Sequence, residues 1–250
     1  SVTTADSNTG IGRNAGSAIT TGSNNVAVGA LTLDANTTGQ RNTAVGQQSF
    51  STNTTGSYNT ALGRSALFSN TTADNNTSVG YEALYANTTG DRNVAVGALA
   101  LDANTTADAN TAVGYEALTT NTTAEGNTAV GFGSLRLNTT GGSNTGIGQN
   151  ALLSNTTGAR NVGVGVSAGV AITTGAYNVL MGAYAGDAIT TGEQNVAVGD
   201  AALSANITGT DNVSIGDQSL KVNTASNNTA VGSSALLANT TGAHNTAVGT

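Results

Sequence analysis

The chain of 250 residues carries 7 basic and 14 acidic residues, has a net charge of −7, and contains neither Cys nor Pro. This balance leaves no basic surface for phosphates, which argues against nucleic-acid binding, and the lack of Cys excludes disulfides and thiolate metal sites. No apolar run approaches the ~20 residues of a membrane helix, so we expect no membrane contact within this segment.

The chain is organised by one repeat, N-[TV]-A-V-G-x-x-A-L-x-x-N-T-T-G-x-x, whose first Asn we number as position 1. The steps between these Asn residues are 17 residues long, except for one step of 16 from Asn212 to Asn228. The period predicts an all-β, parallel β-solenoid of about fourteen coils. Position 1 is occupied by Asn8, Asn25, Asn42, Asn59, Asn76, Asn93, Asn110, Asn127, Asn144, Asn161, Asn178, Asn195, Asn212, Asn228 and Asn245.

Each repeat predicts the same succession of elements along the chain. In the repeat that begins at Asn25, we expect strands near residues 25–29 and 32–38, with turns near residues 30–31 and 39–41. Position 5 is Gly in every copy, which indicates a bend, a positive φ or a close approach of the backbone. We expect the residue missing between Asn212 and Asn228 to be absorbed in the turn at positions 15–17.

The strand at positions 1–5 predicts two dry faces. Positions 2 and 4 hold β-branched or apolar residues and predict one buried face. Position 3, on the other face, is small and uncharged in nearly every copy, so we expect it to contact a second molecule of the same chain. This predicts a homo-oligomer through the face that contains Ala27, Ala44, Ala112 and Ala129.

Two further patterns divide the interior from the surface. All 21 charged residues stand at positions 6, 7, 10, 16 or 17, which therefore predict the solvated surface. Most copies pair a large residue at position 9 with Asn at position 12, but three copies pair Gly with Ile: Gly16 with Ile19, Gly169 with Ile172, and Gly186 with Ile189. Because cores conserve volume, we expect both positions to point inward and the Asn at position 12 to form a ladder of stacked amides.

The first residue falls at position 11 of a repeat, and Thr250 falls at position 6. We therefore expect residues 1–250 to be one uncapped repeat array, a slice of a longer fibre.

The motif N-T-A-V-G-x-x-A resembles the N-S-V-A-I-G-x-x-S/A repeat of the YadA-like heads of trimeric autotransporter adhesins, and the Asn-Thr-Thr-Gly segments are similar to arrays in phage tail-fibre shafts. The resemblance covers nearly the whole chain, although the repeat is a few residues longer than the usual head repeat. It implies a left-handed β-roll, three chains around one axis, and an adhesive or fibre role on a cell surface or virion, with a host-surface or glycan receptor.

Other functional interpretations rest on particular residue types. The Asn-x-Thr triplets match glycosylation sequons, but the exchange of Asn with Ile at position 12 favours an inward ladder over a glycan, for example at Asn121. The Thr residues at positions 13 and 14 could form an ice-binding row. Adjacent residues point to opposite faces, so at most one of the two Thr rows can point outward. Tyr81, Tyr115 and Phe132 predict an exposed aromatic row that could stack on neighbours or meet a ligand.

The sequence predicts no catalytic, cofactor-binding or metal-ligating residues. It has one His, no Cys and no pair of carboxylates set apart from the surface scatter. The leading prediction is an extracellular structural or adhesive fibre segment rather than an enzyme. The alternatives are a β-solenoid that binds ice or a glycan, and a filament subunit that stacks end to end.

Overall fold

The computed structural model describes residues 5–249 and confirms the predicted parallel β-solenoid with coils of 17 residues. Residues 1–4, predicted to continue positions 11–14, and residue 250, predicted to be position 6, lie outside the described residues. The chain divides into two units, residues 1–126 and 127–250, and each is described by itself.

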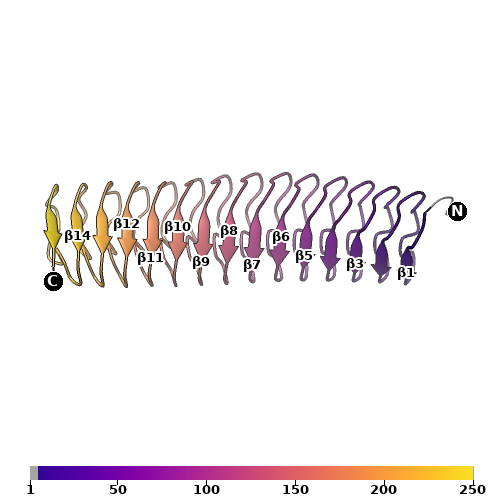
Figure 1. Cartoon of the computed structure of the whole chain (residues 1–250), viewed down its shortest axis with the longest axis horizontal. Coiled ribbons are helices and arrows are strands. Elements are labelled where there is room, and N and C mark those ends of the chain that lie inside the picture. The colour runs from indigo at the N-terminus through magenta and orange to yellow at the C-terminus, as the bar shows by residue number, and fades with distance from the viewer. Residues whose placement is uncertain (1–4, 250) are drawn as a thin grey trace. The chain divides into compact units, whose positions relative to one another are not determined.

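Unit 1 contains seven strands of three residues, one for each coil, and each pairs in parallel with the next (Figure 1). They are β1 (Thr9–Ile11), β2 (Val26–Val28), β3 (Thr43–Val45), β4 (Thr60–Leu62), β5 (Thr77–Val79), β6 (Val94–Val96) and β7 (Thr111–Val113).

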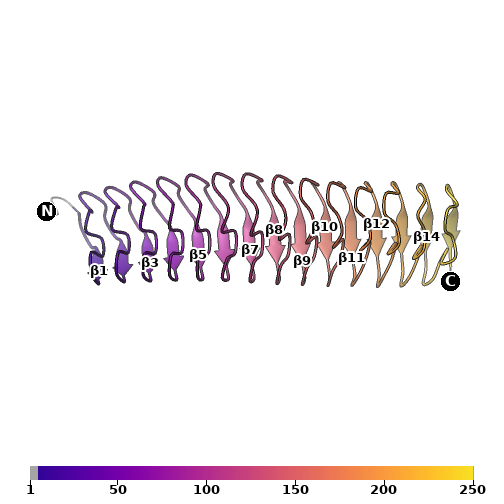
Figure 2. The same cartoon turned by 180° about the vertical axis from the view of Figure 1, so that it is seen from behind.

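Unit 2 contains eight strands that pair in the same manner, as the view from behind also shows (Figure 2). They are β8 (Thr128–Val130), β9 (Thr145–Ile147), β10 (Val162–Val164), β11 (Val179–Met181), β12 (Val196–Val198), β13 (Val213–Ile215), β14 (Thr229–Val231) and β15 (Thr246–Val248).

The pairing places residues one repeat apart directly over each other, as in Ala27 with Ala44. The backbone ladder also continues beyond the strands. For example, Leu33 N–H donates to Ser49 O in the next coil at 3.1 Å, and Thr37 N–H donates to Thr54 O at 2.9 Å. Each coil is therefore hydrogen-bonded to its neighbour around most of its circumference. These bonds satisfy the backbone N–H and C=O groups that the short strands leave without partners.

The predicted second strand at positions 8–14 is wrong, because these residues form turns. Positions 7 and 9 have positive φ even where they are not Gly, as in Leu31 at 56° and Leu33 at 50°. Left-handed residues at every second position bend the chain and prevent an extended strand. The Asn residues at position 7, Asn14 and Asn150, are the sequence signal for this conformation, since Asn tolerates positive φ.

Gly at position 5 has both the positive φ and the close backbone approach that the sequence predicted as possible reasons for Gly. Gly97 has φ of 134°, and a Cβ built there would overlap the carbonyl group of Gly114 in the next coil. Both the backbone conformation and the close approach of adjacent coils therefore require Gly.

The interior confirms the predicted exchange of volume between positions 9 and 12. Leu67 and Leu118 at position 9 are fully buried, and so are Ile172 and Ile189 at position 12 of the exchanged copies. A Cβ added to Gly186 would lie 2.8 Å from Ile189 Cδ1, so the two positions share one space. A large residue from either position fills it, as close packing requires.

The Asn ladders run inside the coil, as predicted. Asn53 Nδ2 donates to Asn36 Oδ1 at 2.8 Å and to Gly56 O at 3.0 Å, and all three residues are buried. The Asn residues at position 1 form a second ladder, in which Asn42 N–H donates to Asn25 Oδ1 at 3.0 Å. Buried amides in these ladders thus satisfy each other and the turn backbone, although Asn155 Oδ1 and Asn206 Oδ1 accept no hydrogen bond. Asn121 is also buried, which leaves no room for a glycan on its side chain.

The short repeat in unit 2 lacks position 14 rather than a residue of the turn, so the predicted location is wrong. Asn223 Nδ2 donates to Ala225 O at 2.9 Å, the bond that the Asn at position 12 makes to position 15 in other coils, and Asn227 keeps the positive φ of position 17. The deletion falls at an exposed corner, because the turn at positions 15–17 carries the bonds that anchor the Asn at position 12.

Candidate functional site

The outward side of each strand is formed by positions 2 and 4, and we call these side chains the strand face. In unit 1, Val28, Thr43 and Thr60 are half-buried and Val45 is exposed. In unit 2, Ile147 and Met181 are 40% and 43% exposed. The prediction that these positions point into the coil is therefore wrong. No copy places a charge at either position, and an uncharged, partly apolar face of this kind is typical of a surface that another molecule covers.

The predicted oligomer face is also wrong in its residues. Ala27, Ala44, Ala112 and Ala129 point into the coil and are at most 1% exposed. Position 3 must be small because position 9 reaches across to it: a Cβ on Gly163 would lie 2.8 Å from Leu152 Cγ. The small residues reflect a narrow interior, and a contact between chains at the strand must use its opposite side.

Leu180, the large residue at position 3, supports the explanation that position 9 limits the size of position 3. Leu180 is fully buried, and the residues next to it at position 9 are Gly169 and Gly186. A Cβ on Gly169 would lie 2.6 Å from Leu180 Cδ1. Position 9 is therefore Gly in both coils that face Leu180, and Leu180 and Ile189 of the same coil are both fully buried.

The two Thr residues of each repeat differ in exposure. The Thr hydroxyls at position 13 donate to backbone carbonyls of the next coil. Thr37 Oγ1 donates to Thr54 O at 3.0 Å, and Thr54 Oγ1 donates to Thr71 O at 3.0 Å. Thr at position 14 is exposed, as in Thr38 and Thr55. This agrees with the expectation that at most one Thr row points outward.

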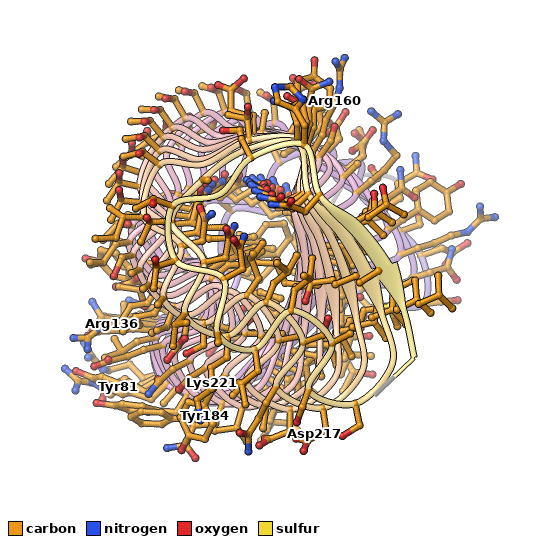
Figure 3. The ribbon with its side chains drawn as sticks, turned by 90° about the vertical axis from the view of Figure 1, so that its left-hand side faces the viewer. Tyr81, Arg136, Arg160, Tyr184, Asp217 and Lys221 are labelled. Carbon is orange, nitrogen blue, oxygen red and sulfur yellow. The ribbon has the colours of Figure 1, made fainter. Side chains whose placement is uncertain are left out.

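The charged positions lie on the surface, as predicted, because no charged residue of the described range is buried as a whole. Within unit 2, Figure 3 shows Arg136, Tyr184, Asp217 and Lys221, from positions 6, 7 and 10, on one side of the coil, and Arg160, from position 17, on another. Unit 2 therefore carries charged side chains on two separate sides of its coils.

The side chains of Arg41, Arg64 and Arg160 each stack on a Tyr ring of the next coil. Arg41 and Arg160 lie 5.3 Å from the ring centroids of Tyr58 and Tyr177, and each also donates to the Tyr hydroxyl. A Tyr one repeat after an Arg meets the cation because the coils are in register.

The third pair belongs to a larger cluster in unit 1, which we call the aromatic patch. Arg64 lies 5.5 Å from the centroid of Tyr81, and the rings of Phe68 and Tyr85 stack at 5.2 Å with an interplanar angle of 7°. A hydrogen bond with Glu82 is the main cause that raises the pKa of Tyr81 above 10.0. Tyr81 is 43% exposed, which confirms the predicted exposure of the row that contains it. The patch comprises Arg64, Phe68, Tyr81, Glu82, Tyr85 and Asp102.

Asp102 carries an unusual carboxylate. Burial, with a smaller contribution from the charge of Glu82, raises its pKa from 3.8 to about 6, although hydrogen bonding to the group opposes the shift. Its Oδ1 is buried and accepts no hydrogen bond. The hydroxyl of nearby Thr119 donates to Leu99 O at 2.7 Å. By contrast, Asp34 Oδ1 at the same repeat position accepts a hydrogen bond from Ser51 Oγ at 2.6 Å.

The described residues contain no cluster of three or more His, Cys, Asp or Glu side chains that could hold a metal ion. No helix in the same range has the length and apolar character needed to cross a membrane.

Comparison with known proteins gives no family. No family model matches the chain, and no curated protein matches it.

Proposed function

We propose that this chain is a structural segment of an extracellular fibre, on a cell surface or a virion, in which three copies associate along their strand faces. The observation that supports this proposal is the strand face itself, which is uncharged in every copy and partly apolar. Its mechanical role is to hold an adhesive or receptor-binding tip at a distance from the surface that carries it.

The association has a simple energetic basis. A Val side chain gains about 1.5–3 kcal/mol on full burial, so a half-exposed Val at position 4 gains on the order of 1 kcal/mol when a neighbour covers it. The gain recurs in every coil, and a second copy of this chain matches the spacing of the coils along the whole contact. Backbone hydrogen bonds along the axis resist extension and proteolysis within each coil stack.

Sedimentation equilibrium tests the assembly. We expect a mass three times the 24.3 kDa of one chain. The double variant Val79→Lys/Val96→Lys places charges on the strand face and should sediment as a monomer. The control is Thr89→Lys/Thr106→Lys, which adds the same charges at exposed position 14 of the same two coils and should remain a trimer. A wild-type chain that stays monomeric at all concentrations would overturn the proposal.

A second candidate, binding of ice or of a glycan, is favoured by the exposed Thr row at position 14. Its hydroxyls recur at the spacing of the coils, about 4.8 Å. Ice shaping and thermal hysteresis of the isolated chain, or a signal on a glycan array that is lost in Thr72→Val/Thr89→Val, would favour this candidate. A trimer without either activity would exclude it.

A further inference from the structure

The strand face of unit 2 contains four successive strands that are aliphatic at both outward positions. At position 2 the chain has Thr in nine coils and Val in six, and four of the six Val coils are consecutive, from β10 to β13. Strand pairing stacks their outward side chains into two continuous rows. These rows, which we call the aliphatic block, are Val162, Val179, Val196 and Val213 at position 2, and Val164, Met181, Val198 and Ile215 at position 4.

The aliphatic block is open to solvent and has a charged border. Its Val side chains are half-buried, and Met181 and Ile215 are 43% and 38% exposed. Exposed charged residues flank the strands at both ends, with Arg160 before β10 and Asp217 after β13. Figure 3 shows these two residues on opposite sides of the coil, with the strands running between them. An apolar centre inside a polar border is the usual arrangement of a protein–protein interface.

The size and spacing of the block indicate what covers it. Eight partly exposed aliphatic side chains offer on the order of 300 Å², whereas each partner contributes about 800 Å² to a standard interface. The partner must therefore also cover coils beyond the block and match their spacing of about 4.8 Å. A second copy of this chain meets both requirements, because its own coils have the same spacing and the same mixture of Thr and Val.

The order of Val and Thr coils favours copies that are parallel and level with each other. In this arrangement every Val coil meets itself, including β2 and β6, whose Val26 and Val94 stand alone between Thr coils. A shift by one coil would place an end of the block against Thr145 or Thr229 of the neighbour and bury a hydroxyl among aliphatic groups. An antiparallel contact centred on the block would match the block but not β2 and β6.

We propose that the aliphatic block is the part of the strand face that binds the copies together and sets their register. The block of one copy packs against the same block of each neighbouring copy, with the chains parallel and level. The coils that carry Thr at position 2 extend the contact and contribute less to its strength. This inference rests on the proposed function, since it names the segment through which the copies associate.

A matched pair of double variants tests the role of the block. Val179→Thr/Val196→Thr changes two coils inside it, and Val26→Thr/Val94→Thr makes the same change in isolated Val coils. Thr occupies position 2 in nine coils, so both variants should fold. In sedimentation equilibrium, we expect the first variant to raise the concentration at which half of the trimer dissociates at least about tenfold, and the second to raise it about twofold or less.

The two variants differ because of their surroundings. A hydroxyl at Val179 or Val196 would be buried among aliphatic groups above, below and across the contact, where it loses its water without gaining a partner. A hydroxyl at Val26 or Val94 would have Thr residues in the coils on both sides. A gain of association provides a second measurement that misfolding cannot imitate. Thr145→Val/Thr229→Val lengthens the block by one coil at each end and should lower the same concentration about threefold to tenfold.

Distances between spin labels test the register. The chain has no Cys, so Thr140→Cys and Thr191→Cys each place one nitroxide on exposed position 14, away from the strand face. Parallel, level copies should give the same distance between labels at both sites in double electron–electron resonance. An antiparallel contact centred on the block would separate the Thr191→Cys labels by about one coil along the axis and the Thr140→Cys labels by about seven coils, which is about 34 Å.

The outcomes separate this inference from the proposed function. A wild-type chain that stays monomeric would overturn both. A trimer that the two double Val→Thr variants weaken equally would overturn the inference alone, because the strand face would then contribute uniformly. Label distances that differ between the two sites by more than about 10 Å, which is two coils, would also overturn it. Selective weakening by the block variant together with equal label distances is the result that we expect.

Discussion

At the scale of single residues, the structure depends on a few positions where backbone conformation and burial act together. Asp102 and Gly97 show the two cases. The first is a half-buried carboxylate whose charge the fold compensates only in part, and the second is a residue whose missing Cβ allows two coils to approach.

Asp102 should make the protein less stable as the pH rises. Because its pKa is raised from 3.8 to about 6, the folded chain retains a proton that the unfolded chain loses between these values. Stability therefore falls from about pH 4 to about pH 6 and stays lower above it. Asp102→Asn should raise the melting temperature at about pH 7.5 by about 2–6 °C, after allowance for solvent screening of the partly exposed group, and change it little at about pH 4.

Thermal unfolding followed by circular dichroism at both pH values measures this difference, with Asp34→Asn as the control. A lower melting temperature for Asp102→Asn at the higher pH would contradict the assignment of a charge that the fold compensates only in part.

Gly97→Ala should destabilise unit 1 by about 2–4 kcal/mol, because the new Cβ requires both an unfavourable φ and separation from the Gly114 carbonyl. The control Ala98→Ser changes the next residue, at a position that carries polar and charged side chains in other copies, and should shift stability by less than about 0.5 kcal/mol. Urea unfolding of both variants gives the comparison. Similar urea midpoints for the two variants would show that the coils can move apart at Gly97 without loss of stability.

At the scale of the elements, the coil is a strand of three residues followed by a chain of turns whose side chains alternate between interior and surface. The outward row of charged positions and the inward row of Leu and Asn follow from that alternation. The large interior side chain comes from position 9 in most coils, and from position 12 or position 3 where position 9 is Gly.

The exchange between positions 9 and 12 can be reproduced in a regular coil. Leu67→Gly alone leaves a cavity and Asn70→Ile alone overfills the layer, so each should destabilise the chain by about 2–4 kcal/mol. The double variant recreates the pair found at Gly186 and Ile189, and Gly also suits the positive φ of 54° at Leu67. We expect a favourable coupling of about 1–3 kcal/mol in a double-mutant cycle from denaturant unfolding. Additive effects would mean that the two side chains do not share one space.

Much of the coil could be predicted from the sequence, because periodicity reports which residues stack. The position of every strand, the role of Gly at position 5 and the inward Asn ladder all follow from it. The direction of position 3 could not be read in this way. Small uncharged residues fit a narrow interior and a contact between chains equally well, and only the reach of Leu152 toward Gly163 decides between them.

The turns at positions 6–11 escape prediction for a different reason. Leu at position 9 has no preference for positive φ, so its strand-like pattern conceals a left-handed conformation that neighbouring coils impose. The aromatic row can be expected from the sequence, but the unpartnered Oδ1 of Asp102 depends on which side chain stands beside it in the next coil. Such a contact can be found only in the structure.

At the scale of the whole molecule, hydrogen bonds and apolar packing stabilise both units, and charged side chains contribute little. Charged residues make up only 8% of the chain. In unit 1, Arg92 and Asp108 form an ion pair at 2.9 Å, and both side chains are accessible to solvent. Exposed ion pairs of this kind contribute about 0–1 kcal/mol.

Stability should therefore depend weakly on salt. Between about 50 mM and about 1 M NaCl we expect the melting temperature to change by no more than about 3 °C, and to rise rather than fall, because screening reduces the repulsion among the acidic side chains. Differential scanning calorimetry over this range measures the effect. A decrease of more than about 5 °C would indicate a larger ionic contribution to folding than exposed ion pairs supply.

The coil that lacks position 14 shows where this architecture tolerates changes in length. Asn223 and Asn227 keep their ladder and turn geometry although one residue is gone between them. The corners between positions 13 and 14 in other coils are therefore natural points for inserted peptides, which would be displayed outward without shifting the register of the coils. A protein of this kind could gain new binding loops one coil at a time while its scaffold remains unchanged.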